Sequence, residues 1–203
     1  MTEVIDSRAK NRWAKSDISY HNYQSYIKNK SDIYNLTIID LFYISNFKGG
    51  NASIHEDEIK VNKKLNFYSN ILKKIDNSFR VKELKDLTEA ECNKLIIMLE
   101  KACGLTNNNT LTKIDGFGPS YLSALLNAYF PNLIPILDRR MLINLKLVKK
   151  QNVRSGQIVN IEDFYASLIK KFAELSKKSP NESFRDIDRN YFSRKLDIES
   201  LEL

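Results

Sequence analysis

Apolar residues recur at helical spacing along almost the whole chain, and no long stretch alternates between apolar and polar positions. The clearest stripe lies in residues 88–104 and consists of Cys92, Leu95, Ile96, Leu99 and Cys103. Thr88 precedes it with Glu91 three positions later, which is the capping-box pattern of a helix start, and Gly104 suits a helix end. The pattern predicts an all-α fold with negligible strand content.

The same periodicity predicts seven further helices, separated by segments rich in turn-forming residues. Their expected ranges are 16–29, 35–48, 56–75, 119–130, 137–149, 161–177 and 183–195. No break is long enough for an interdomain linker, so residues 1–203 are expected to form a single domain, either compact or of two intimately packed lobes. Residues 1–15 are largely polar and charged apart from Trp13, which is typical of a flexible arm that a lone Trp anchors to the core.

The composition favours polyanionic partners. The 203 residues are 42% hydrophobic, enough to bury a core, and carry a formal net charge of +7. A positive surface attracts nucleic acid, although a generic Lys-rich surface would have the same charge. The first residues mix acidic with apolar side chains and contain no uninterrupted apolar segment. We therefore expect no signal peptide, no membrane partner and a cytoplasmic location.

The cysteines and histidines show no metal-ligand pattern. Cys92 and Cys103 lie eleven positions apart, which fits neither a zinc knuckle nor a four-cysteine iron–sulfur cluster, so both are expected to be core thiols. His21 and His55 are isolated and are interpreted as surface or structural residues.

The most informative segment is residues 111–126, in which a Gly-x-Gly turn separates two stretches of helical pattern. A short helix is expected to run into Gly116, and a second one to begin at Pro119, whose fixed φ suits a first helical position. Two glycines let backbone amides approach an anion, and a helix start offers unpaired N–H groups, so a phosphate is the natural ligand. A tight turn between helices would need the same glycines.

An acidic residue follows this hairpin after a proline-containing loop. Pro131 and Pro135 favour an extended segment, and Asp138 then stands at the start of another helical pattern. In that position Asp138 is either a helix N-cap or a functional carboxylate.

Together, residues 111–145 resemble the helix-hairpin-helix-GPD superfamily of base-excision DNA glycosylases. Ser120 stands where the lyase-competent members have a catalytic Lys, and Asp138 follows it by eighteen residues, the separation expected in that family. The run Pro135–Asp138 looks most like the adenine glycosylase branch. Leu122 departs from the small Ala usual in these enzymes, and the missing iron–sulfur cysteines restrict the resemblance to cluster-free members.

The resemblance implies a two-lobed glycosylase fold and a double-stranded DNA partner, with a nucleotide rotated out of the duplex. Asp138 would be the catalytic carboxylate, stabilising the oxocarbenium-like sugar and activating water. Because position 120 has no amine, we expect a monofunctional glycosylase without strand cleavage. The residues expected to contact DNA are Gly116, Phe117, Gly118, Ser120, Lys113, Arg139 and Arg140, with pairing to a protein carboxylate as the alternative for one of the two arginines.

Two further sites follow from the resemblance. No cofactor is expected, except that a hairpin of this kind commonly holds K⁺ or Na⁺ with backbone carbonyls, here those of Thr112, Ile114 and Phe117. Pocket residues are expected in the loop after the helix at 35–48, namely Phe47 and Asn51, with a plain helix end as the alternative that the two glycines there favour. Asp40 is the nearest candidate for the general acid of adenine glycosylases.

Two alternative functions share these residues. In the first, the hairpin belongs to a non-catalytic DNA-binding protein, and Asp138 merely caps its helix. In the second, the glycosylase scaffold serves defence against foreign DNA, such as that of phages, in place of base excision repair. Near the C-terminus, residues 184–192 are expected to form an amphipathic helix that packs on the core, with Arg185 and Arg189 in local ion pairs.

Overall fold

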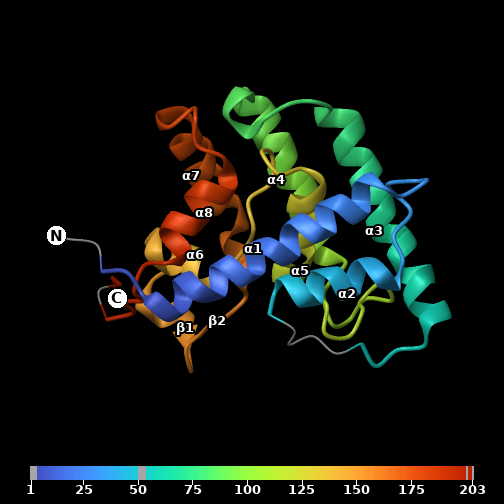
Figure 1. The fold of residues 1–203 in the computed structure, drawn as a ribbon, viewed down its shortest axis with the longest axis horizontal. Helices are drawn as coiled ribbons and strands as arrows, with labels where there is room; N and C mark the ends of the chain where they lie inside the picture. Colours follow the sequence, from blue (N-terminus) through green and yellow to red (C-terminus); the bar gives the residue numbers. More distant parts are fainter. Residues whose placement is uncertain (1–3, 50–53, 200, 203) are drawn as a thin grey trace.

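The structure, a computed structural model, describes residues 4–49, 54–199 and 201–202. The described residues are mostly helical, which confirms the all-α expectation (Figure 1). The α-helices are α1 (Ser7–Lys28), α2 (Ile38–Phe47), α3 (Glu58–Phe79), α4 (Glu89–Gly104), α5 (Pro119–Tyr129), α6 (Arg139–Asn144), α7 (Tyr165–Lys178) and α8 (Phe184–Phe192). Short 3-10 turns span Leu84–Asp86, Lys150–Asn152 and Ile161–Phe164, and two antiparallel strands of two residues each, β1 (Val153–Arg154) and β2 (Gln157–Ile158), make a small hairpin.

The helices surround one continuous hydrophobic cluster that draws side chains from α1 through α8. Figure 1 shows α6, α7 and α8 gathered on one side, α2 and α3 on the other, and α1 running across both. None of the helices in the described residues has the length and apolar character that crossing a membrane would require. Cys103 is buried in the cluster, where burial raises the pKa of its thiol to about 12, and Cys92 is half-buried beside it.

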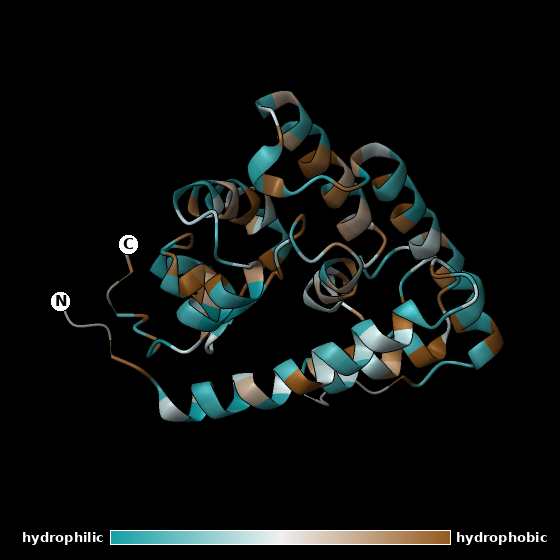
Figure 2. Ribbon diagram, turned by 45° about the horizontal axis from the view of Figure 1, so that its top comes forward, coloured by the Kyte–Doolittle hydropathy of each residue, from teal (hydrophilic) through white to brown (hydrophobic). Residues whose placement is uncertain are grey.

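The first helix begins much earlier than the apolar pattern predicts. α1 starts at Ser7, so the expectation of a flexible arm over residues 1–15 is wrong for residues 7–15. Asp6 caps the helix by accepting hydrogen bonds from the amides of Arg8 and Ala9 at 3.0 and 3.1 Å. Figure 2 shows that hydrophilic residues dominate this half of α1. The helix is thus held there by its cap and by Trp13, which packs against α8 as expected of an anchor.

Two other boundaries differ from the expectation. Residues 105–118 form turns and bends, so the short helix expected before Gly116 is wrong. The hydroxyl of Tyr68 on α3 donates to the carbonyls of Leu105 and Thr112, which replaces helical hydrogen bonds with tertiary ones. α6 ends at Asn144 rather than near residue 149, and Lys146 two residues later has a φ of 55°, a left-handed conformation that ends helical winding.

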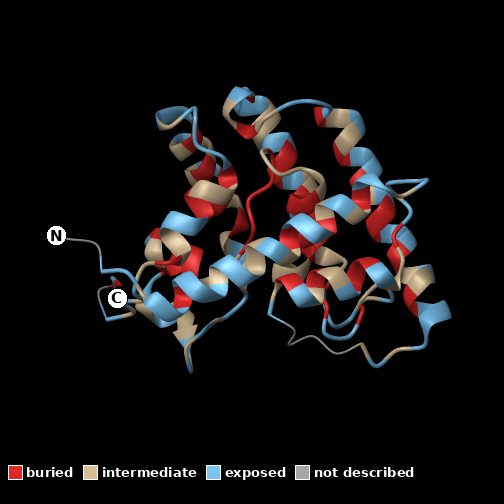
Figure 3. Cartoon of the chain, in the orientation of Figure 1, coloured by how far each residue is buried: buried red, intermediate tan, exposed pale blue. Residues whose placement is uncertain are grey.

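Between α5 and α6 the chain turns at residues 131–133 and then runs to Asp138 without helix or strand. Residues 133–137 are buried, which leaves their backbone polar groups in need of partners (Figure 3). Buried polar side chains supply them. Ser123 accepts a hydrogen bond from the Leu137 amide at 2.8 Å, and Asn127 donates to the Ile134 carbonyl at 2.7 Å. Tyr165 on α7 donates to the Pro135 carbonyl at 3.0 Å. These bonds fix the path of the chain into Asp138.

We predict that Ser123→Ala lowers the free energy of unfolding by about 1–3 kcal/mol, because it leaves the buried Leu137 amide without an acceptor. Ser176→Ala is the matched control. Ser176 is also buried, but its hydroxyl donates only to the Phe172 carbonyl within α7, so its loss leaves no amide unpaired. Urea unfolding of both variants measures the difference, and equal effects would contradict the role given to Ser123.

Candidate functional site

A pocket of about 890 Å³ opens where α1, the end of α2, the start of α5, the segment into α6, β2 and α8 meet. Its volume lies within the range of about 300–1,000 Å³ that is usual for small-molecule sites. Six cationic and two acidic side chains line it: Arg12, Lys15, Lys48, Arg139, Arg140, Arg185, Asp138 and Asp188. The excess of positive charge makes the pocket attractive to an anionic ligand.

Asp138 stands on the wall of this pocket with each carboxylate oxygen engaged. Oδ1 accepts a hydrogen bond from the Arg140 amide at 2.8 Å, which makes Asp138 the N-cap of α6. Oδ2 lies 2.9 Å from the Lys48 ammonium, at the end of α2. The side chain keeps 22% of its surface exposed. Asp138 is therefore both a helix cap and a group that a ligand can reach.

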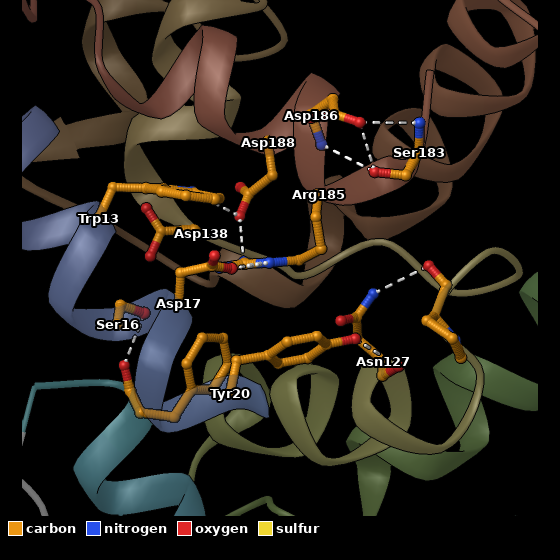
Figure 4. A network of polar contacts seen from close by, with 12 residues as sticks. Trp13, Ser16, Asp17, Tyr20, Asn127, Asp138, Ser183, Arg185, Asp186 and Asp188 are labelled. Carbon is orange, nitrogen blue, oxygen red and sulfur yellow. Dashed lines mark hydrogen bonds and ion pairs between the residues drawn. The ribbon is translucent and has the colours of Figure 1, made fainter. Parts of the chain in front are cut away.

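A second carboxylate, Asp188 of α8, faces the same pocket within a network around Arg185 (Figure 4). Its Oδ2 accepts hydrogen bonds from the Trp13 indole at 3.4 Å and from Arg185 at 2.7 Å. The Arg185 guanidinium also pairs with Asp17 at 2.7 Å and stacks over the ring of Trp13, 4.5 Å from its centroid. The network holds the Trp13 ring at the pocket.

The surroundings shift the pKa values of these two carboxyl groups in opposite directions. Burial raises the pKa of Asp138, but the Lys48 ammonium and the Arg140 amide outweigh it, so the pKa lies below its ordinary value. Burial also raises the pKa of Asp188, and there it outweighs the Arg185 guanidinium, while the negative charge of Asp138 adds to the increase. Pairs of acids with diverging pKa values are typical of sites that need one charged and one protonated carboxyl group.

The Gly-x-Gly turn lies directly before α5 and beside the pocket. Gly116 has a φ of 76°, the left-handed conformation that favours glycine, and Gly118 is the N-cap of α5 with no side-chain cap. A Cβ added at Gly118 would meet no atom within 4 Å, so the space on that side of its Cα is open. Two positions on, Ser120 lines the pocket. The helix start and Asp138 therefore border the same cavity, as the motif spacing predicts.

Phe117 and Lys113 have roles inside the turn itself. Phe117 is buried against Tyr68, with ring centroids 5.4 Å apart. The Lys113 ammonium donates to the Phe117 carbonyl at 3.0 Å, and burial lowers the pKa of this lysine. Neither residue is among those that line the pocket.

The carbonyls expected to hold an alkali cation do not fit one. Thr112 accepts a hydrogen bond from Tyr68 at 3.1 Å, and Ile114 accepts one from the Phe117 amide at 3.0 Å. The Phe117 carbonyl accepts from the Lys113 ammonium, whose positive charge would repel a second cation.

The two arginines after Asp138 are tied to the protein. The guanidinium of Arg140 donates to the carbonyls of Phe192 and Arg194 and pairs with Asp6 at 3.1 Å. The alternative of a protein ion pair thus holds for Arg140, since it locks the start of α6 to both ends of the chain. Arg139 donates to the Gly156 carbonyl in the β1–β2 turn and lines the pocket, where it adds positive charge.

The remaining pocket candidates have different outcomes. Phe47 lines the pocket as expected, and its carbonyl accepts a hydrogen bond from Ser16 of α1 at 2.9 Å. Asn51 lies outside the described residues. Asp40 as a general acid is wrong, because it is fully buried in the capping box of α2 and pairs with Lys30 at 3.0 Å. The carboxylate of Asp40 therefore has a structural role, and Asp40 does not line the pocket.

Sequence reasoning missed Lys48, Asp188 and the pocket-facing role of Trp13. Asp188 belongs to an amphipathic helix whose charges were expected to pair locally, and the Arg185–Asp188 and Arg189–Asp186 pairs confirm that expectation. No feature of the neighbouring sequence distinguishes Asp188, which lines the pocket, from Asp186, which does not. Lys48 precedes two glycines at the end of a predicted helix. This pattern marks the segment as a helix end, but it does not indicate that the Lys48 ammonium reaches the pocket.

No family model matches the chain, and no curated protein or solved structure is significantly similar to it. Within the described residues, no three His, Cys, Asp or Glu side chains gather as a metal site would require. The functional argument therefore depends on the residues and geometry of the pocket.

Asp188 gives the free energy of unfolding a specific pH dependence. Its folded-state pKa lies above 3.8, so its contribution to stability is complete below that pH and is lost as the pH rises through the folded-state pKa. We expect the stability of the wild-type protein relative to Asp188→Asn to fall as the pH rises from 3.8 towards neutrality, measured by urea unfolding at a series of pH values.

Asp186→Asn, on the same helix, is the control, because the pH dependence of stability expected for Asp186 has the opposite sign. The hydrogen bond from Ser183 lowers the pKa of Asp186, so its contribution is present above pH 3.8 and is lost as the pH falls through the lowered value. Identical slopes for the two variants would show that burial does not govern Asp188.

Proposed function

We propose that the chain is a DNA glycosylase that hydrolyses the N-glycosidic bond of a damaged or modified base flipped out of duplex DNA. The observation that carries this proposal is the shared pocket: the Asp138 carboxylate and Ser120 at the start of α5 border one cation-rich cavity of about 890 Å³. A flipped nucleotide needs such a cavity, a carboxylate near its sugar and donors for its phosphate.

Asp138 would act on the sugar. Its lowered pKa keeps the carboxylate ionised at neutral pH, so it can stabilise positive charge that develops on the sugar as the base departs. The same oxygen atoms can orient an attacking water or take its proton. The base itself would lie against the Trp13 ring, which lines the pocket and is held by Arg185 and Asp188.

Asp188 is suited to the departing base. Because burial raises its pKa, it holds a proton at a higher pH than Asp138 does. A protonated carboxyl group at the pocket wall can donate a hydrogen bond to a ring nitrogen or exocyclic oxygen, which makes the base a better leaving group. The two carboxyl groups would thus serve opposite ends of the bond that breaks.

The phosphate backbone would meet the uncapped start of α5 and the cationic rim. Arg12 and Lys15 lie exposed on α1 at the edge of the pocket, and Arg139 flanks Asp138. These charges attract the backbone in a sequence-independent manner, while the pocket would select the base.

A second function, a DNA-binding protein without catalysis, is favoured by one observation. Asp138 accepts the Arg140 amide as the N-cap of α6, a structural role that requires no chemistry. In that case the pocket would bind a nucleotide and leave it intact.

Asp138→Asn separates these two functions. Asparagine caps helices about as well as aspartate does, so the variant should fold and still bind DNA. We expect its rate of base release to fall by about 100-fold or more. The measurement is base release from duplexes that contain oxidised, alkylated, deaminated or hypermodified bases, followed by alkali cleavage of the abasic sites.

Asp57→Asn is the matched control for this experiment. Asp57 caps α3 in the same manner, accepting the Lys60 amide at 3.2 Å, but it does not line the pocket. Its variant should keep wild-type activity. Full base release by Asp138→Asn, or no release by the wild-type protein from any duplex, would leave only the binding function.

Binding to an unmodified duplex should weaken steeply as salt concentration rises, because phosphate contacts release counterions. Replacing one phosphate-contacting cation, by Lys15→Gln or Arg12→Gln, should reduce the slope of log K against log salt by about one. Lys178→Gln on α7 is the control, since Lys178 pairs with Glu174 and lies outside the pocket lining. Fluorescence anisotropy at several salt concentrations measures the slopes, and a flat response in the wild-type protein would argue against DNA.

A further inference from the structure

The Asp138 carboxylate on the pocket wall has a primary amine as its closest charged partner. The Lys48 ammonium lies 2.9 Å from Oδ2 of Asp138, although ninety residues separate the two in the chain. The Lys48 side chain is 12% exposed, and both residues line the cavity. The fold thus brings an amine to the cavity that Ser120 also lines.

Backbone hydrogen bonds fix the end of α2 that carries Lys48. Lys48 is the C-cap of α2, where its own amide donates to the Ile44 carbonyl at 2.8 Å. The preceding carbonyl, that of Phe47, accepts the hydroxyl of Ser16 on α1 at 2.9 Å, so the end of α2 is tied to the opposite wall of the pocket. An amine anchored at its backbone and reaching a cavity can meet a bound ligand repeatedly in the same position.

Other lysines of the described chain are placed differently. Lys30 pairs with the buried Asp40, and Lys113 donates to the Phe117 carbonyl; neither lines the pocket. Lys15 lines the pocket but lies exposed on α1. Lys48 combines access to the cavity with a carboxylate that can take its proton.

A permanent ion pair would be served as well by arginine, which does not lose its proton in proteins. Lysine differs because its neutral form is a nucleophile toward carbonyl carbon. Asp138 also has other positive partners, the Arg140 amide and the charge of Arg139, so it does not depend on Lys48 alone to stay ionised.

We propose that Lys48 is a catalytic nucleophile that forms a Schiff base with the aldehyde of an abasic sugar and so gives the protein a strand-cleaving lyase activity. This rests on the proposed function insofar as the pocket must accept the sugar of a flipped nucleotide. It replaces the expectation of purely hydrolytic chemistry, which depended on the absence of an amine at position 120 alone.

The proton and electron balance closes with these two side chains. Oδ2 of Asp138 takes a proton from the Lys48 ammonium, and the free amine adds to C1′ of the ring-opened sugar to form a carbinolamine. The Asp138 carboxyl group returns its proton to the hydroxyl group, which leaves as water, and a protonated imine remains. Loss of a proton from C2′ to the carboxylate then forms the C2′–C3′ double bond and breaks the bond from C3′ to its phosphate oxygen. Water hydrolyses the imine and restores the amine.

The test uses a duplex in which an abasic site has already been made, so it does not require base excision by this protein. The full-length protein is incubated with this duplex and sodium borohydride, which reduces an imine to a stable covalent bond, and the adduct is resolved on a denaturing gel. We expect an adduct in the wild-type protein whose cross-linked peptide contains Lys48. In parallel samples without borohydride, the strand should be cut on the 3′ side of the abasic site.

Lys48→Arg is the decisive variant, because it keeps the positive charge beside Asp138 while removing the amine. Its adduct should fall by about tenfold or more, whereas Lys178→Arg, outside the pocket lining, should retain the wild-type yield. Thermal unfolding and binding to the abasic duplex establish that each variant folds and reaches its ligand.

The proposal is overturned if Lys48→Arg forms as much adduct as the wild-type protein, if the cross-link maps to another amine, or if the bound wild-type protein forms no adduct. Each of these outcomes is independent of base release from modified duplexes. A protein that traps on abasic DNA but releases no base would support Lys48 and defeat the glycosylase proposal, and the reverse result would do the opposite.

Discussion

Two hydrogen bonds through one buried hydroxyl connect the halves of this site. Ser123 donates to the Ser120 carbonyl and accepts from the Leu137 amide, both at 2.8 Å. The first turn of α5 is thereby joined to the residue directly before Asp138. Since residues 130–138 contain no helix or strand that would define their path, this bond and those from Asn127 and Tyr165 decide where the carboxylate lies.

The charges in the pocket likewise depend on hydrogen-bond donors from neighbouring elements. Asp138 would be costly to keep charged at a partly buried position, and the end of α2 and the start of α6 offset that cost with an ammonium and a backbone amide. The charged form of Asp188 is stabilised less, because its partner Arg185 is shared with Asp17. The contrast between the two carboxyl groups therefore arises from the number and kind of donors on neighbouring elements.

Charge and shape act together in the proposed chemistry. The cationic rim would draw the DNA backbone to the pocket, and the volume of about 890 Å³ would admit one nucleotide. Trp13 offers a ring on which a base can stack, and the guanidinium of Arg185 packs against that ring. The Lys48–Asp138 pair adds reactivity at the sugar, so that recognition and reaction occupy different walls of one cavity.

Much of the fold follows from local pattern alone. The stripe and capping box predict α4 almost to its boundaries, because periodicity and capping are properties of neighbouring residues. The start of α1, the turns before Gly116 and the partners of Asp138 could not be predicted in this way. They depend on contacts across the chain, such as the ninety residues between Lys48 and Asp138, and only packing decides which distant side chains share a buried space.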